Sequence, residues 1–172
     1  MTAPREVWRE RDRALTAGAK TLVSSPFARG AATVLAHSGD SLVWIPVAVV
    51  LWRFGTGTWA QAGTRILLNT GLTALITTLL KRWVRRPRPG GEKSHFYLRM
   101  DEHSFPSGHA VRIGGLWVML TGLLPLWGTA ALLLWGLSVV VSRVALGLHY
   151  VSDVAAGLPI GAGAGLVLLM VL

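Results

Sequence analysis

The sequence predicts an all-α integral membrane protein, with about five transmembrane helices packed as a bundle in a single domain over residues 1–172. Hydrophobic residues make up 52% of the chain and charged residues only 15%, whereas about 25% of a typical soluble domain is charged. The mean hydropathy is +0.50. Long apolar segments recur along the chain, and a helix needs about 20 mostly apolar residues to cross a bilayer.

The first 20 residues are basic and contain no apolar core of the length that a signal peptide needs. Arg5, Arg9 and Arg13 recur at four-residue spacing, and Trp8 and Leu15 supply apolar surface. This pattern fits a helix that lies in the membrane interface. A solvated, frayed tail is the alternative.

The first spanning helix is predicted from about Ala31 to Phe54, and its clearest part runs from Leu42 to Trp52. His37 and Asp40 are interpreted as the polar beginning of this helix. A second spanning helix is predicted from about Ala60 to Leu80. Each of these segments has about the length required to cross the hydrocarbon core.

A polar segment, residues 81–105, follows, and it cannot lie in lipid without support from the rest of the protein. The third helix is expected from Ser107 or Gly108 to Leu124, since Ser is a good N-cap and Pro125 comes just past the end. The fourth covers roughly Trp127 to Gly147 and the fifth Val151 to Leu172. Small residues in the fifth helix would permit close helix packing: Gly157, Gly161, Gly163 and Gly165.

Successive helices alternate in direction, so the polar segment 81–105 and the short turn 146–150 should meet on one membrane face. Ionisable and polar residues concentrate in these two places and at the adjoining helix ends: Lys81, Arg88, Ser107, His109, Arg143, His149 and Asp153. Metal sites combine histidines with carboxylates, but here three cations outnumber Asp153. We therefore expect a phosphate-like ligand, with no metal and no other cofactor.

Each residue type suits this ligand. Arginine offers forked donors that match phosphate oxygens, and lysine adds a point charge. The segment 106–109 opens a helix, where backbone N–H groups and the dipole favour an anion, and Gly108 lets the backbone approach the ligand closely. Arg112 lies one turn after His109 and could also touch phosphate.

Two histidines can take complementary roles. Asp153 follows His149 by four residues and therefore lies on the same helical face. It can accept a hydrogen bond from one imidazole nitrogen, which leaves the other nitrogen nucleophilic. His109 can hold a proton and deliver it to the departing oxygen.

Three motifs carry a resemblance to a known family. They are Lys81, six residues, Arg88-Pro89; then Pro106-Ser107-Gly108-His109; then Ser142-Arg143, five residues, His149, three residues, Asp153. The chain resembles the type 2 phosphatidic acid phosphatase family, which is related to the vanadium haloperoxidases. The resemblance implies a phosphate pocket formed by Lys81, Arg88, Ser107, Gly108 and Arg143. It also implies His149 as nucleophile, Asp153 as its orienting residue and His109 as general acid.

The resemblance implies a metal-independent lipid phosphate or diphosphate phosphatase with a phosphohistidine intermediate, acting on a polyprenyl (di)phosphate or a polyprenyl-phosphoryl sugar phosphate. Phosphatidylglycerophosphate and phosphatidic acid are alternative substrates. A lipid phosphotransferase that uses the same pocket and a non-enzymatic protein that binds anionic lipids are alternative functions.

Outside the motifs, Arg82, Arg85 and Arg86 are interpreted as anchors for lipid headgroups, and His95 and His103 as solvated loop residues. The net charge of +9 lies beside apolar segments, which favours membrane lipids and a lipid phosphate as partners and argues against nucleic acid. The protein is expected in the plasma (inner) membrane of a bacterium, because its small single-domain build resembles that of bacterial members of the family. The positive-inside rule places the catalytic face in the cytoplasm.

Overall fold

The computed structural model describes residues 4–89 and 102–172, and this part of the chain is helical with no strands. The elements follow the order α1 (Pro4–Ala19), a short 3₁₀ helix η1 (Lys20–Val23), α2 (Pro26–Ser38), α3 (Ser41–Phe54), α4 (Thr58–Val84), α5 (Gly108–Leu120), α6 (Leu126–Ala145) and α7 (Val151–Val171). The predicted all-helical fold is therefore confirmed.

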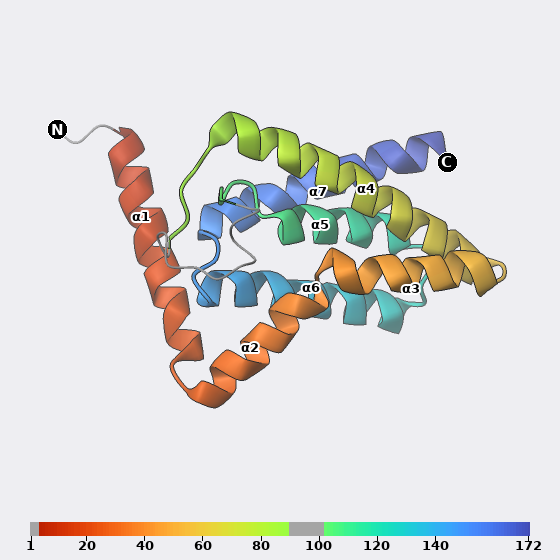
Figure 1. Cartoon of the computed structure of the whole chain (residues 1–172), viewed down its shortest axis with the longest axis horizontal. Helices are drawn as coiled ribbons and strands as arrows, with labels where there is room; N and C mark the ends of the chain where they lie inside the picture. Colours follow the sequence, from red (N-terminus) through yellow and green to blue (C-terminus); the bar gives the residue numbers. More distant parts are fainter. Residues whose placement is uncertain (1–3, 90–101) are drawn as a thin grey trace.

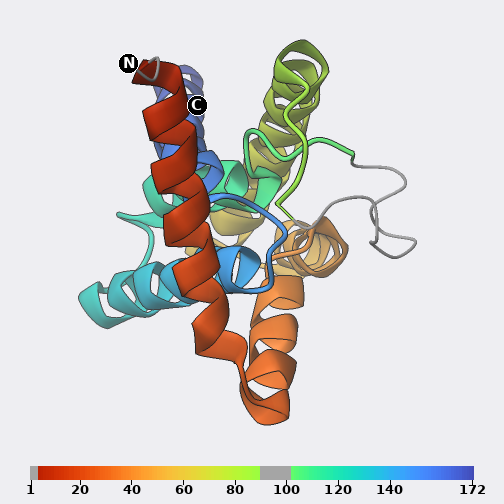
Figure 2. The same cartoon turned by 90° about the vertical axis from the view of Figure 1, so that its left-hand side faces the viewer.

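Helices α3 to α7 lie alongside one another, whereas α1 runs across one end of this bundle (Figure 1). The same view places the end of α4, the end of α6 and the start of α7 near α1, and the C-terminus at the opposite end. Figure 2, seen from the α1 side, shows this helix in front of the bundle. The N-terminal segment is thus a docked helix, and the alternative of a frayed tail is wrong.

Helices α6 and α7 are long and apolar enough to cross a membrane, with 20 and 21 residues and mean hydropathies of 1.6 and 2.1. Within the described ranges, α2 and α3 pass the same test only as a pair that is bent by 46°. The prediction of one continuous helix from Ala31 to Phe54 is wrong, because the chain breaks at Gly39 and Asp40. The described part of the chain therefore holds two spans by length and composition, or three if the bent pair counts as one.

Helix α4 extends one turn beyond its predicted end and stops at Arg85, whose φ of 50° is left-handed. This extension places Lys81 in the last turn of the helix, where it is buried. Polar side chains on α4 face the bundle: Arg65 donates to the carbonyl of Met119 at 2.8 Å, and Asn69 to that of Arg112 at 3.1 Å. These bonds fix α4 against α5, as expected for buried polar groups.

Glycines bring α5 and α7 into backbone contact. A Cβ atom at Gly161 would lie 1.7 Å from the carbonyl oxygen of Val111, and Gly157 and Gly165 are also closed to a side chain by α5. Gly163 faces open space, so its predicted packing role is wrong. Helix α5 also ends at Leu120 and not at Leu124, and its 13 residues span only about 20 Å.

Candidate active site

Hydrogen bonds tie the segment between α4 and α5 to the turn between α6 and α7 and to the first turn of α7. Arg88 Nη1 donates to the carbonyl of Leu148 at 2.7 Å, and Ser107 N donates to that of Asp153 at 3.1 Å. The third bond joins His149 Nδ1 to the carbonyl of Ser104 at 2.8 Å. The polar segment and the turn therefore meet at one end of the bundle, as the alternating topology predicts.

His149 is buried, with 1% of its surface exposed, and its ring orientation is fixed by the Ser104 carbonyl. A carbonyl oxygen can only accept, so Nδ1 must carry the hydrogen. In a neutral ring this leaves Nε2 with its lone pair. The sequence gives no signal for Ser104, because its contribution is a backbone oxygen.

Asp153 is fully buried beside His149, but it is not the direct partner of the ring. Its Oδ2 lies 3.8 Å from His149 Nδ1, which is longer than a hydrogen bond. That oxygen accepts instead from the backbone N–H of Tyr150 at 2.9 Å, and Oδ1 accepts from Arg86 Nη1 at 2.7 Å. In place of the direct hydrogen bond expected from the four-residue spacing, the carboxylate lies 3.8 Å from the ring nitrogen.

Burial of the ring is the main cause that lowers the pKa of His149 from 6.5 to about 4. The Asp153 carboxylate opposes this shift, and three cations reinforce it: Arg88, Arg143 and Lys81. The three predicted phosphate-binding cations thus lie within electrostatic range of one imidazole. At neutral pH this imidazole is uncharged.

The N-terminus of α5 adds backbone donors to the same end of the bundle. Ser107 is its N-cap, is fully buried, and accepts a long 3.5 Å bond from Ala110 N. A Cβ atom at Gly108 would lie 3.4 Å from Thr77 Cγ2, which is van der Waals contact. The first N–H groups of α5 are the donors that a helix leaves without an internal partner.

His109 faces a different carboxylate, which the sequence reading did not connect with it. Its Nε2 lies 2.8 Å from Oδ1 of Asp40, and Oδ2 of Asp40 lies 2.8 Å from Nδ1 of His37. Interpreting Asp40 as the beginning of a continuous helix was wrong, because it occupies the break between α2 and α3. Arg143 lies within electrostatic range of both His109 and His149. The two histidines therefore share one cationic neighbourhood.

Arg112 is buried and binds the junction between α2 and α3. Its Nη1 donates to the carbonyl of Gly39, and its Nη2 donates to Ser41 Oγ at 2.6 Å. These hydrogen bonds hold the junction between α2 and α3 against α5. Its accessory phosphate contact stays a prediction.

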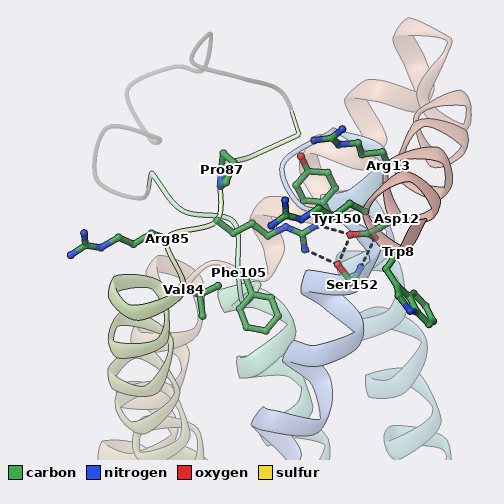
Figure 3. A pocket seen from close by; sticks show the side chains of 11 residues that line it. Trp8, Asp12, Arg13, Val84, Arg85, Pro87, Phe105, Tyr150 and Ser152 are labelled. Carbon is green, nitrogen blue, oxygen red and sulfur yellow. Dashed lines mark hydrogen bonds and ion pairs between the residues drawn. The ribbon is translucent and has the colours of Figure 1, made fainter. Parts of the chain in front are cut away.

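Arg86 was predicted to anchor lipid headgroups, and that interpretation is wrong. Besides Asp153, its guanidinium donates to Ser152 Oγ at 2.7 Å and to Asp12 Oδ2 at 2.6 Å, and it stacks over Tyr150 at 3.9 Å from the ring centroid. Figure 3 shows Asp12, Tyr150 and Ser152 gathered between α1 and the start of α7. One arginine thus ties α1 to the buried carboxylate beside His149.

Asp12 remains an anion in this network. Burial alone would raise its pKa, but hydrogen bonds from Ser152 and Arg86 outweigh burial and hold the pKa below its ordinary value. A cavity of about 570 Å³ lies beside the network, and Figure 3 shows Arg85 extending away from the group around Asp12. The cavity is lined by Trp8, Arg9, Asp12, Arg13, Val84, Arg85, Arg86, Pro87, Phe105, Tyr150 and Ser152.

The remaining predicted residues lie apart from these contacts. His103 is half-buried and precedes Ser104, whereas His95 lies outside the described residues. Across residues 4–89 and 102–172, no cluster of three or more His, Asp or Glu side chains has the geometry of a metal site. The prediction of a metal-free reaction stays a prediction.

The family model of the PAP2 superfamily matches residues 62–172, and the chain belongs to this family. The predicted family resemblance is therefore confirmed.

Relatives and a solved structure agree with this assignment. The chain is 28% identical over 161 residues to phosphatidylglycerophosphatase B of Bacillus subtilis, covering 83% of this chain and 74% of the relative. It is 28% identical over 137 residues to undecaprenyl-diphosphatase of Sulfolobus acidocaldarius, covering 77% of this chain and 65% of that relative. The crystal structure of a transmembrane PAP2 type phosphatidylglycerolphosphate phosphatase from Bacillus subtilis superimposes with a TM-score of 0.76 at 26% identity, covering 94% of this chain and 84% of that one. The chain is thus an integral membrane phosphatase.

Proposed function

We propose that this protein hydrolyses a lipid phosphate or diphosphate through a covalent phosphohistidine on Nε2 of His149. The observation that carries the proposal is the hydrogen bond from Nδ1 to the Ser104 carbonyl, because it leaves Nε2 as the nitrogen with a lone pair. A pKa of about 4 keeps this ring neutral across the physiological range. A buried neutral imidazole beside fixed cations suits attack on an anionic phosphoryl group.

In the first step, Nε2 of His149 forms a bond to phosphorus while the bond from phosphorus to the leaving oxygen breaks. His109 gives its proton to that oxygen. In the second step, His109 takes a proton from water, the resulting hydroxide attacks phosphorus, and the phosphorus–nitrogen bond breaks. Phosphate leaves, and both rings return to their starting protonation states.

Charge on the transferring phosphoryl oxygens would be stabilised by groups already in place. Lys81, Arg88 and Arg143 lie within electrostatic range of His149, and the N-terminus of α5 begins beside them at Gly108. Preorganised donors of this kind commonly contribute the largest part of phosphoryl-transfer catalysis. The proposal needs no metal, so activity should persist in excess chelator and fall with orthovanadate, which imitates the five-coordinate transition state.

We propose a polyprenyl phosphate or diphosphate as the lipid, and the relative named undecaprenyl-diphosphatase supports this choice. Phosphatidylglycerophosphate is the second candidate, favoured by the relative and the solved structure from Bacillus subtilis. Purified protein should be assayed for phosphate release against a panel of both lipids and phosphatidic acid. One lipid class hydrolysed at least ten times faster than the others would identify the substrate.

Matched variants decide between the rival functions. His149→Ala should abolish release, whereas His103→Ala should not, since His103 lies outside the network. Release by the His149→Ala protein at the parental rate would contradict the proposal. Lipid binding without any turnover by the wild-type protein would favour a lipid-binding role, and turnover only with an added acceptor lipid would favour a phosphotransferase.

We also propose that α4 and α5 lie in the membrane beside the apolar spans, which makes five membrane segments with α1 at the interface. The exposed apolar side chains of α4, such as Leu75 and Leu79, support this arrangement. The charge bias favours a cytoplasmic position for the catalytic end. A compartment-sensitive reporter fused after Leu172 should then report the opposite side, and a cytoplasmic signal would reverse the orientation.

A further inference from the structure

Asp40 lies at the break between α2 and α3, and each of its carboxylate oxygens contacts a histidine. Oδ1 is 2.8 Å from His109 Nε2, and Oδ2 is 2.8 Å from His37 Nδ1. Aspartate at a helix N-cap commonly accepts a bond from an N–H group of the first turn. The Asp40 side chain makes no such bond to α3. Its carboxylate contacts the two histidines and does not cap α3.

The residues on either side of Asp40 hold it in this position. Arg112 donates to the carbonyl of Gly39 and to Ser41 Oγ, and so clamps both neighbours onto α5. A Cβ atom at Gly39 would lie 2.9 Å from His109 Cδ2 and 2.8 Å from Val139 Cγ1. No side chain fits there unless the imidazole moves. The break therefore seats one carboxylate against one ring.

Charges of both signs surround His109. Arg112 from α5 and Arg143 from α6 lie within electrostatic range of the ring, and both disfavour an imidazolium. Asp40, from the junction of α2 and α3, is the carboxylate that favours it. The exposed fraction of the side chain falls from 55% at His37 to 10% at Asp40 and 13% at His109. The carboxylate thus acts where water screens charge poorly.

We propose that Asp40 is a positioning residue that holds His109 through Nε2 and turns Nδ1 toward the leaving oxygen. This inference rests on the proposed function, in which His109 is the acid and base. As an imidazolium, His109 donates Nε2–H to Asp40 and transfers the Nδ1 proton to the leaving oxygen. The neutral ring keeps Nε2–H on Asp40, and its Nδ1 lone pair then accepts the proton of the attacking water. His37 fixes the second oxygen of Asp40 and takes no part in the transfer.

The test compares Asp40→Asn with wild-type protein and with Glu10→Gln, an acid-to-amide change at an exposed position of α1. kcat/KM is measured over pH 4–9 on farnesyl phosphate, whose leaving group needs a proton, and on para-nitrophenyl phosphate, whose leaving group needs little help. We expect Asp40→Asn to lower kcat/KM for farnesyl phosphate by about 10²-fold and for para-nitrophenyl phosphate by less than about 10-fold. The alkaline limb of the pH profile should move to lower pH. His37→Ala should cost less than about 5-fold on either ester.

The outcomes separate this inference from the proposed function. Equal losses on the two esters with an unchanged pH profile would mean that Asp40 only supports the fold, and parental activity in Asp40→Asn would also overturn its role. If His37→Ala lost as much turnover as Asp40→Asn, the passive role of His37 would be overturned. Wild-type protein that is inactive on both esters and on the lipid panel would instead overturn the proposed function itself.

Discussion

The two histidines of the site contact different kinds of acceptor. His149 gives its Nδ1 hydrogen to a neutral backbone carbonyl at 2.8 Å, and its nearest carboxylate stands at 3.8 Å. His109 lies 2.8 Å from the carboxylate of Asp40. A carbonyl fixes the tautomer of a ring with little stabilisation of its cation, whereas a carboxylate stabilises the cation directly. The same side chain is thereby suited to nucleophilic attack in one place and to proton transfer in the other.

The carboxylates differ in their own partners too. Asp153 is bound by the guanidinium of Arg86, which in turn binds Asp12 on α1, so much of its charge is already compensated. Asp40 contacts the imidazoles of His37 and His109, each at 2.8 Å. One of its oxygens directly contacts His109. This difference predicts that substitutions around His149 and substitutions around His109 should change the kinetics in different ways.

The largest effect should come from removing the nucleophile. His149→Ala should lower kcat by about 10⁴-fold or more, because the nitrogen that forms the covalent intermediate is lost. Phosphate release from the preferred lipid measures this loss, with His103→Ala as the matched control. Residual activity within tenfold of wild type would show that His149 is not the nucleophile.

Arg143 lies within electrostatic range of both His109 and His149. Its removal should have the second largest effect on activity. Arg143→Ala should lower kcat/KM by about 10²- to 10³-fold, because a preorganised charge on the transferring oxygens is lost. Arg82, exposed on the last turn of α4, provides the control, and Arg82→Ala should retain activity within about threefold. Inhibition by orthovanadate should weaken in Arg143→Ala alone. Equal effects of the two substitutions would argue for a general surface-charge effect.

Asp153→Asn should have a smaller effect, because the Ser104 carbonyl still fixes the tautomer of His149. A loss of about 10- to 10²-fold in kcat is expected, below the roughly 10⁴-fold loss seen where a carboxylate is the direct partner of a catalytic histidine. Steady-state kinetics on the same lipid measures this loss of kcat. A loss as large as that of His149→Ala would mean that the carboxylate and not the carbonyl orients the ring during turnover.

The smallest effect concerns pH. A pKa of about 4 for His149 means that the ring is protonated, and the nucleophile lost, only as the pH falls through about 4. At pH 5 about nine-tenths of the rings remain neutral, whereas a ring with the ordinary value of 6.5 would be almost fully protonated. The acidic limb of kcat/KM should therefore lie near pH 4. A limb near 6.5 would show that the ring is not shielded as the structure indicates.

The sequence predicts the half of the site that is local in the chain. His149 and Asp153 share a helical face by their spacing, and the cations and Ser107 follow from the motifs. Asp40 lies 69 residues from His109 in sequence, so no periodicity connects them. The polar pair Gly39-Asp40 within an apolar run was the available signal for a break in the helix. Arg86 stands among similar exposed arginines, and only the docking of α1 distinguishes it from them.

The central claim is the covalent phosphohistidine on His149, and rapid acid-free quenching of the enzyme with ³²P-labelled substrate tests it most directly. With ³²P-labelled para-nitrophenyl phosphate, whose leaving group needs little help from an acid, His109→Ala should accumulate the label, because the first step is largely retained and water is no longer activated for the second step. The account predicts an alkali-stable, acid-labile label on the peptide that carries His149, and none in the His149→Ala, His109→Ala double variant. A label on another residue, or a label that survives in the double variant, would contradict it.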